Sequence, residues 1–446
     1  MAIIKGLRGL RFTPAAGEIS ELCCPPYDVI SDGQRREYLS RNPHNVIRLE
    51  LPKEGADPYA EAARVLNEWL DGGILTRDEE SLYLYEEEFS ANGERVKVKG
   101  LICRVRLEEF EKGVILPHES TLSKAKEDRL SLMKATGCNF SQIYSLYMDE
   151  DRAIRPRVDA LSSGAPQVEF PDADGVVHRL WQVTDQAEIA AISEAFLNRK
   201  LFIADGHHRY ETGLNYRDYM RSIGKAREGD GCDYIMMMLV EMENEGLRVL
   251  PTHRLIRGLN GFSRDSLISA ASRYFEVQTV RFARRRGLVG RFRKNTSEED
   301  RDPAYMAEKA LRAYYDKNQT AFVLYSGGDS FDLLILRDNK VMSGRMPGCS
   351  EALRNLDVSV LHTLLLEDVL GIDKANMADQ TSLTYVKLAG EAIAAVRAGE
   401  AQGAFILNPT RVSEIRDVAA AGEKMPQKST YFYPKLITGL VMNQLD

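Results

Sequence analysis

A strand, a tight turn and a helix follow one another in a single short stretch of this sequence, and the turn between them is crowded with charge. Residues 201–204 form an apolar run of the length of a buried strand. Asp205 and Gly206 then form a dipeptide that is typical of turns. From His207 to about residue 221, aromatic and apolar residues recur with helical spacing. The sequence therefore predicts a strand that leads directly into the N-terminus of a helix.

This predicted turn has the features of a phosphate-binding site. The first N–H groups of a helix have no partner within the helix and carry a partial positive charge, which together suit a phosphate. Gly206 lets a ligand approach the backbone closely. His207, His208 and Arg209 add side-chain donors, and the guanidinium fork of Arg209 can hold phosphate oxygens. We therefore expect these four residues to bind a nucleotide or a phosphate.

Asp205 needs a separate explanation, because its carboxylate would repel a phosphate. It could accept the proton of a substrate hydroxyl, or bind a Mg²⁺ ion that bridges to phosphate oxygens. The structural alternative is that Asp205 is an ordinary N-cap and that the histidines beside it are solvated. A charged cluster behind a buried strand is costly unless it is used, so we favour a functional role for the whole turn.

A second group of polar residues surrounds the start of a helix that is expected over residues 124–135. Cations in the first turns of a helix oppose its dipole, so they suit a bound anion such as a nucleotide phosphate. The acidic residues at positions 127 and 128 could neutralise them instead. The group comprises His118, Glu119, Lys124, Lys126 and Arg129.

Two loops elsewhere in the chain carry residues that suit a site. In residues 25–30, two prolines fix an extended backbone and hold Tyr27 and Asp28, which we expect to contact the substrate. Near the C-terminus, the hydroxyls of Ser429 and Thr430 follow Lys428, and three aromatic residues come next. Such a loop suits a ligand that has both an anionic group and a flat group, because the lysine and hydroxyls can hold the anion while an aromatic ring stacks on the flat group. The alternative is a packed loop whose tyrosines fill the core.

Length, charge and cysteine content limit the class of protein. A chain of 446 residues with 44% hydrophobic and 28% charged residues is typical of a globular protein with two or three domains, or with one core that carries large insertions. The net charge of −7 argues against nucleic acid or a membrane surface as a partner. The six cysteines include no C-x-x-C pair, and neither a signal peptide nor an apolar run of about 18 residues is evident. We therefore expect a reducing, cytoplasmic location.

The hydrophobic pattern predicts strands and helices mixed along the chain, an α/β (α+β) fold. Residues 81–90 and 95–107 are expected to form an antiparallel hairpin around an Asn-Gly turn. Residues 45–51 are expected to form a strand. A helix is expected over residues 57–71.

A second hairpin is expected from residues 234–242 and 247–255, and a separate α/β region begins at about residue 263. We therefore expect an N-terminal region over residues 1–262 that carries the charged turn. The C-terminal region would cover residues 263–446, with its tail loop returning to the site.

These motifs occur in the order found in a known family. Over nearly its whole length the chain resembles the bacterial and archaeal domain-of-unknown-function family numbered 1015. The motifs that carry the resemblance lie at residues 25–30, 42–45, 117–119, 124–129, 205–212, 356–358 and 425–435.

The charged turn also resembles the phosphate-binding turn of the ParB/sulfiredoxin-like superfamily, whose members bind ATP, ADP or CTP and include free L-serine kinases. The resemblance implies a ParB/sulfiredoxin-like nucleotide-binding core with large insertions and a C-terminal α/β extension. It also implies ATP or ADP as phosphoryl donor, with Mg²⁺. In those kinases an aspartate of the equivalent turn looks catalytic, a role that carries over to Asp205. In the compact domains of that superfamily the turn comes soon after the first strand, whereas in this chain it comes much later. Glu119 and Glu211 are therefore only candidates for the second carboxylate.

We therefore expect a nucleotide-dependent phosphotransferase that converts free L-serine to O-phospho-L-serine, with Asp205 as catalytic residue and metal ligand. One alternative is a nucleotide-binding regulatory protein, a ParB-like switch without kinase activity. The other is a metal-dependent hydrolase that uses His207 and Glu211, which lie one helical turn apart, with His118 or Asp205. The expected partners are L-serine and a nucleotide, neither nucleic acid nor membrane, and a homodimer is left open.

Overall fold

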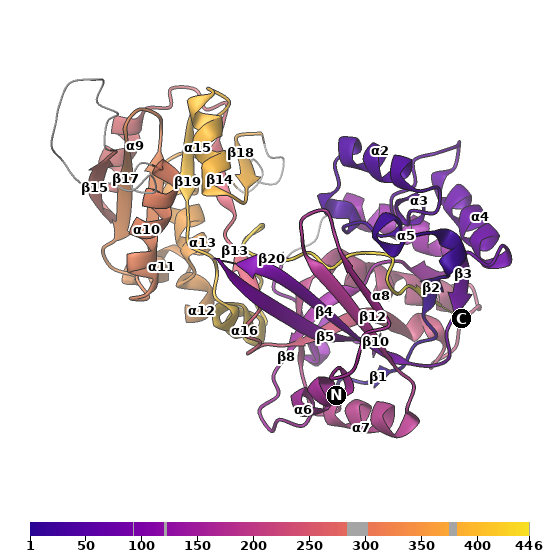
Figure 1. Ribbon diagram of the computed structural model, residues 1–446. Helices are drawn as coiled ribbons and strands as arrows, with labels where there is room; N and C mark the ends of the chain where they lie inside the picture. The colour runs from indigo at the N-terminus through magenta and orange to yellow at the C-terminus, as the bar shows by residue number, and fades with distance from the viewer. Residues whose placement is uncertain (92, 120–122, 283–301, 374–380, 446) are drawn as a thin grey trace. The chain divides into compact units, whose positions relative to one another are not determined.

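The chain folds into two compact units. The computed structural model describes residues 1–445 apart from 92, 120–122, 283–301 and 374–380, and it describes no side chain at 123–125. Unit 1 comprises Met1–Arg248 and Phe432–Asp446, and unit 2 comprises Val249–Tyr431 (Figure 1). Each unit has its own sheet and its own helices, so the mixed α/β class predicted from the sequence is confirmed.

The boundary between the units lies at Arg248, earlier than the predicted residue 262. The reason is that the second predicted hairpin is wrong. Its first strand, β12 (Tyr234–Glu241), joins the sheet of unit 1, whereas β14 (His253–Ile256) joins the sheet of unit 2. Two alternating runs with a turn signal between them look like a hairpin in sequence even when each strand pairs elsewhere.

A nine-stranded mixed sheet organises unit 1. Its other strands are β1 (Ile4–Lys5), β4 (Leu82–Ala91), β5 (Glu94–Arg106), β6 (Ile115–Leu116), β8 (Ile143–Tyr147), β9 (Val168–Pro171), β10 (Val177–Val183) and β11 (Leu201–Asp205). The order is β6-β11-β8-β12-β5-β4-β10-β9, with β1 paired to β5. β6 with β11 and β8 with β12 are parallel, and the other pairs are antiparallel. The hairpin predicted over residues 81–107 is confirmed as β4 and β5.

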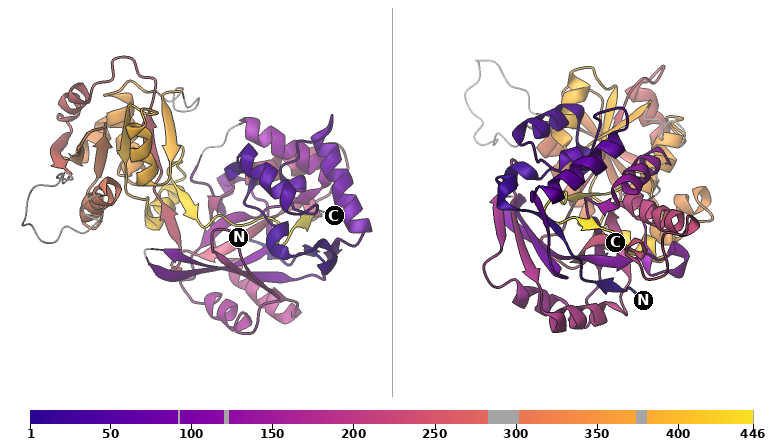
Figure 2. Two further views of the ribbon diagram at one scale, coloured as in Figure 1. Left: turned by 45° about the horizontal axis from the view of Figure 1, so that its top comes forward. Right: turned by 90° about the vertical axis from the view of Figure 1, so that its right-hand side faces the viewer.

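Helices lie on both sides of this sheet, as Figures 1 and 2 show. They are α1 (Ile19–Leu22), α2 (Asp32–Arg41), α3 (Ile47–Glu50), α4 (Pro58–Asp71), α5 (Ser123–Thr136), α6 (Arg155–Leu161), α7 (Gln186–Phe196) and α8 (His207–Ser222). On one side, α6 and α7 bury Val158, Ile192 and Phe196 in the main core. Elsewhere, residues of α3, α4 and α5 share a second core with Leu10 and Met442.

The strand predicted over residues 45–51 is wrong, because Ile47–Glu50 forms the short helix α3. The side chain of Asn45 explains the difference: its Oδ1 accepts a hydrogen bond from the N–H of Ile47 (2.9 Å), and its Nδ2 donates to the carbonyl of Glu21 (2.6 Å). An asparagine that bonds its own backbone two residues on favours a turn over an extended strand.

The C-terminal segment Phe432–Asp446 is built into unit 1. It forms β21 (Asn443–Gln444), which pairs with β7 (Cys138–Asn139), while β2 (Leu10–Phe12) pairs with β3 (Leu75–Arg77). Leu10 and Met442 exchange two backbone hydrogen bonds (2.8 and 3.0 Å). These pairings fix the path of the tail, so residues close to the end of the chain take defined places in unit 1.

Unit 2 is a six-stranded antiparallel sheet with helices on both faces. Its order is β15-β17-β16-β19-β14-β18. Besides β14, the strands are β15 (Phe275–Arg281), β16 (Ala321–Tyr325), β17 (Ser330–Leu336), β18 (Leu383–Val386) and β19 (Gly403–Ile406). One core contains residues of α9 (Arg264–Ala271), α13 (Asp357–Val360) and the π-helix Leu361–Glu367. The core on the other face contains residues of α10 (Pro303–Tyr315) and α15 (Ala389–Arg397).

The remaining α-helices are α11 (Lys340–Arg345), α12 (Glu351–Arg354) and α16 (Val412–Ala420), with β13 (Arg248–Leu250) and β20 (Tyr431–Tyr433) where the chain passes between the units. Short 3-10 helices lie at Pro14–Ala16, Tyr27–Val29, Phe110–Lys112 and Gly231–Asp233. In the part of the chain that the structure describes, no helix combines the length and apolar character needed to span a bilayer.

The close approach of Gly246 to β5 gives a test of the fold of unit 1. A Cβ at this position would lie 1.9 Å from the carbonyl oxygen of Lys97, a backbone atom that cannot move away without distorting β5. We expect Gly246→Ala to destabilise unit 1 by about 2 kcal/mol, as overpacking does, and to lower the first thermal transition seen by circular dichroism. Gly164→Ala is the control, because a Cβ there has no atom within 4 Å. Equal melting temperatures for the two variants would contradict this packing.

Candidate functional site

The predicted strand, turn and helix are present, and Gly206 makes the turn between them. β11 ends at Asp205, Gly206 adopts a left-handed conformation (φ +94°, ψ 27°), and α8 begins at His207. A side chain at Gly206 would be strained by this φ, and its Cβ would lie 2.9 Å from Nε of Arg209. Because Gly206 is the N-cap of α8, Asp205 does not take the N-cap position that the structural alternative required.

The carboxylate of Asp205 lies between two cations. Oδ2 accepts a hydrogen bond from Nη2 of Arg209 at 2.8 Å, and Oδ1 accepts one from Nζ of Lys435. Arg209 also donates to the carbonyl oxygen of Gln142, which ties α8 to the loop before β8. Burial alone would raise the pKa of Asp205, but the charges of Lys435 and Arg209 outweigh it and hold the pKa well below its usual range. Asp205 is therefore ionised at neutral pH and is a weak base.

These contacts do not favour the predicted metal-binding role of Asp205, because a metal ion at its oxygens would be repelled by the positive charges of Arg209 and Lys435. Among the residues that the structure describes, no group of three or more His, Cys, Asp or Glu side chains is arranged to hold a metal ion.

Two histidines pack against each other behind the turn. The rings of His118 and His207 meet edge to face with centroids 4.7 Å apart, and the backbone N–H of His118 donates to Nε2 of His207 at 3.2 Å. Nδ1 of His118 lies 2.7 Å from the carbonyl oxygen of Ile203, so Nδ1 donates there. Burial lowers the pKa of His118 to about 4, so this imidazole is neutral at pH 7. The fully buried His118 thus holds His207 and β11 in place.

The two carboxylates that accompany Asp205 in the prediction both lie near the start of α8. Oε2 of Glu119 is 3.9 Å from Nδ1 of His207. Glu211, one turn into α8, forms an ion pair with Lys126 of α5 at 2.6 Å. Lys124 is also on α5, but its side chain lies outside the described residues.

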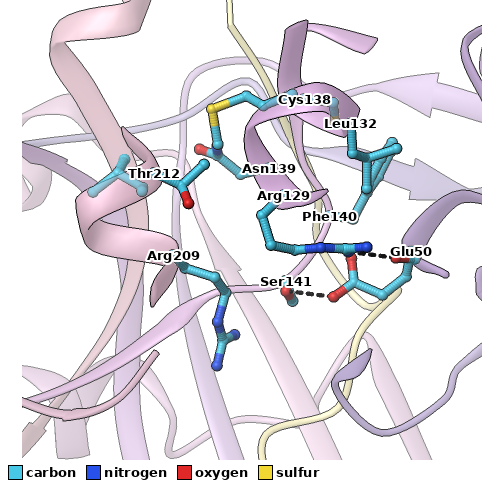
Figure 3. Close-up of a pocket in the computed structure, with 11 residues that line it drawn as sticks. Glu50, Arg129, Leu132, Cys138, Asn139, Phe140, Ser141, Arg209 and Thr212 are labelled. Atoms are coloured by element: carbon cyan, nitrogen blue, oxygen red, sulfur yellow. Dashed lines mark hydrogen bonds between the residues drawn. The ribbon is translucent and has the colours of Figure 1, made fainter. Parts of the chain in front are cut away.

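A small pocket of about 40 Å³ lies between α5, α8 and the loop before β8, and Glu50 is its buried carboxylate (Figure 3). Oε1 of Glu50 accepts a hydrogen bond from Oγ of Ser141 at 2.8 Å, and its backbone oxygen accepts one from Nη1 of Arg129 at 2.6 Å. Burial raises the pKa of Glu50. Arg209 and Thr212 line the same pocket from α8. The sequence analysis missed Glu50 because the segment that carries it was expected to be a strand.

Arg129 connects this pocket to the predicted substrate residues. Its guanidinium carbon lies 4.2 Å from the centre of the Tyr27 ring, and its fork is also paired with Asp128 at 2.6 Å. Burial, together with the charge of Asp28, raises the pKa of Tyr27 to about 12. Asp28 and Tyr27 act electrostatically on Arg209 as well. The structure thus brings residues 27–28, α5 and the start of α8 together in unit 1.

The tail contributes Lys435 to this site, a residue that the sequence analysis did not single out. The sequence did contain a signal for Lys435, because this residue is the last one of the motif at residues 425–435. The three tail residues that were singled out, Lys428, Ser429 and Thr430, belong to unit 2. There the hydroxyl of Ser429 donates to the carbonyl oxygen of Pro426 at 2.5 Å, so it shapes its own loop.

The chain belongs to a known protein family. The family model described as protein of unknown function (DUF1015) matches residues 4–359, and the resemblance noted above is thereby confirmed. Comparison with curated proteins gave no match.

Several solved structures are similar to this chain at low identity. A free serine kinase in complex with AMP is 13% identical, with 78% of this chain and 92% of that chain covered and a TM-score of 0.36. A conserved hypothetical protein from Pyrococcus furiosus is 15% identical, covering 75% and 90%, with a TM-score of 0.33. SbnI with a C-terminal truncation, from Staphylococcus aureus, is 11% identical, covering 76% and 86%, with a TM-score of 0.35.

Replacement of Asp205 by asparagine tests the charge balance of the turn. We expect Asp205→Asn to lower the stability of unit 1 at pH 7 by about 3 kcal/mol, because Arg209 and Lys435 are left without their counter-charge. The stabilisation is present above the unfolded-state pKa of about 4 and is lost as pH falls through the lower folded-state pKa. The difference between wild type and variant in urea unfolding should therefore shrink below about pH 4.

The control for this experiment is Asp218→Asn on the same helix, where the side chain is 63% exposed and a change near zero is expected. An Asp205→Asn variant as stable as wild type at pH 7 would contradict the arrangement.

The protonation of His118 can be measured directly by NMR. With ¹³C-labelled histidine, we expect the His118 signal to keep the chemical shift of a neutral imidazole from pH 8 to pH 5, because its pKa is lowered to about 4. An imidazole in free contact with water would titrate near pH 6.5. A His118 midpoint between pH 6 and 7 would show that the turn opens to solvent.

Proposed function

We propose that this member of the DUF1015 family is a nucleotide-dependent phosphotransferase that converts free L-serine to O-phospho-L-serine. The observation that carries the proposal is the Asp205 turn. It joins a helix N-terminus, a glycine in a conformation suited to close approach, and a carboxylate kept ionised by two cations. The choice of L-serine as acceptor rests on the resemblance of the turn to that of free serine kinases.

The start of α8 supplies the phosphate-binding part. The N–H of Tyr210 is the first to bond within the helix, to the carbonyl of Gly206. The N–H groups of His207, His208 and Arg209 come before it, in the first turn of a helix of 16 residues, where the helix itself provides no acceptor and a phosphate is favoured. A nucleotide would bring its own Mg²⁺ on its phosphates, which is consistent with Asp205 not being a metal ligand.

Asp205 acts in this proposal by orienting the acceptor and not as a strong base. Its lowered pKa means that it accepts a hydrogen bond from the serine hydroxyl without removing the proton early. Phosphoryl transfer through a loose transition state needs little help from a base and depends on positioning and fixed charge. Arg209 and Lys435 supply fixed positive charge beside the reacting oxygens.

Glu119 is the carboxylate that we propose as the final acceptor of the hydroxyl proton. Its Oε2 lies 3.9 Å from Nδ1 of His207, at the start of α8 and close to where the hydroxyl would react. Glu211 is less suited, because its carboxylate pairs with Lys126. We assign Tyr27 and Asp28 to the substrate side and Arg129 to a positioning role, since its donors are taken by Glu50 and Asp128.

The direct test is product formation. Purified protein is incubated with Mg²⁺ and ATP or ADP, with and without L-serine, and O-phospho-L-serine is measured by mass spectrometry. We expect product only when both nucleotide and L-serine are present. Asp205→Asn, checked for folding by circular dichroism, should lower the rate by about 100-fold or more, as loss of a transition-state contact does. Asp218→Asn should retain wild-type activity.

Nucleotide binding without any turnover that depends on L-serine would contradict the kinase. That result would leave the alternative of a nucleotide-responsive regulatory protein.

A further inference from the structure

Unit 2 contains a buried arginine without a counter-ion. Arg254 on β14 is 1% exposed, and within the described part of the chain none of its contacts is to a carboxylate. The other buried arginines, Arg35, Arg129 and Arg217, are 6–8% exposed, and each is paired with an aspartate or glutamate. A buried charge without a counter-ion is costly, and the ring of Tyr385, whose centre lies 5.2 Å from the guanidinium carbon, carries no net charge to neutralise it. Arg254 therefore needs an explanation that the other three arginines do not.

The hydrogen bonds of Arg254 leave donor capacity unused. Nη2 is shared among the carbonyl oxygens of Lys428 (3.1 Å) and Gln427 (3.5 Å) and Nε2 of His362 (3.3 Å), all longer than a charge-assisted bond. Nε is buried and has no hydrogen-bond partner among the described residues, and the same holds for the hydroxyl of Thr252. Thr252 and Arg254 are two residues apart, a spacing that places side chains on one side of an extended chain.

The loop above Arg254 adds a second cation. Lys428 is exposed and has φ +55°, a left-handed conformation that few residues other than glycine adopt. The loop is held in this shape by Ser429, whose hydroxyl donates to Pro426 and whose carbonyl accepts from Thr410 at 2.8 Å. Its backbone carbonyls rest on Arg254, so the buried guanidinium and the exposed lysine belong to one assembly.

We propose that unit 2 carries a binding site for a small oxyanion, a phosphate or carboxylate group, with Arg254 at its base and Lys428 at its rim. Oxygen atoms of such a group would accept from Nε and Nη2 of Arg254, the edge of the fork that matches a carboxylate or phosphate. The hydroxyl of Thr252 would donate as well. The weak bond to Gln427 is the one that the ligand would replace. All of these residues lie in unit 2, so the site does not rest on the proposed kinase.

A structural role is the alternative explanation. Arg254 would then only fasten the loop through its carbonyl oxygens, and added anions would leave it unaffected.

Histidine NMR distinguishes the binding site from the structural role, because the chain has only 7 histidines and each can give a separate signal. His362 contacts Arg254 and reports on the new site, whereas His207 and His208 report on the turn in unit 1. His253 lies next to Arg254 on β14, where successive side chains point to opposite faces, and serves as a local reference. The full-length ¹³C-histidine protein is titrated with inorganic phosphate and separately with acetate, with chloride keeping the ionic strength constant.

We expect phosphate or acetate to shift the His362 signal in a saturable way, with little change at His253. The anion that binds more tightly identifies the ligand class. Lys428→Ala should weaken the response about fivefold, the effect of one partly screened charge, and Lys424→Ala, an exposed lysine in the same tail, should not change it. Arg254→Met should abolish the response. If that variant does not fold, Arg254→Lys keeps the charge without the fork and should weaken binding.

A His362 signal that responds to neither anion would overturn the proposal. So would a response that is unchanged in both Lys428→Ala and the folded Arg254 variant. Shifts confined to His207 and His208 would place anion binding in unit 1 alone.

Discussion

The carboxylate of Asp205 is the point at which three separate parts of unit 1 meet. It ends β11, accepts a hydrogen bond from Arg209 on α8, and accepts another from Lys435 in the C-terminal segment. Two cations around one carboxylate hold the tail and the helix at fixed places beside the strand. The rest of the site depends on this charge balance, because removing the carboxylate would take away the negative charge that lies between the two cations.

The same balance decides what chemistry the turn can perform. An aspartate kept ionised by two cations orients a hydroxyl but is a poor base, and the cations remain as fixed charge where a phosphoryl group would react. His118, neutral and buried, holds the turn from behind. The arrangement therefore favours a reaction in which positioning matters more than proton abstraction, as in phosphoryl transfer.

How much of this could be predicted from the sequence depended on the distance over which the interactions act. The strand, turn and helix around Gly206 follow from local pattern, and the structure confirms them. Lys435 could not be placed, because its partner Asp205 is 230 residues away. Glu50 was missed because one side chain, that of Asn45, turned a strand-like pattern into a helix. The unit boundary was displaced because β12 and β14 pair in different sheets although their turn looked like a hairpin.

The central claim is that the start of α8 binds the phosphates of a nucleotide. A crystal structure of the protein with ADP and Mg²⁺ tests it most directly. We predict that phosphate oxygens lie within hydrogen-bonding distance, about 3 Å, of the backbone N–H groups of His207 and His208, with Asp205 still bonded to Arg209. Density for the nucleotide at another place, with the start of α8 unliganded, would contradict the account.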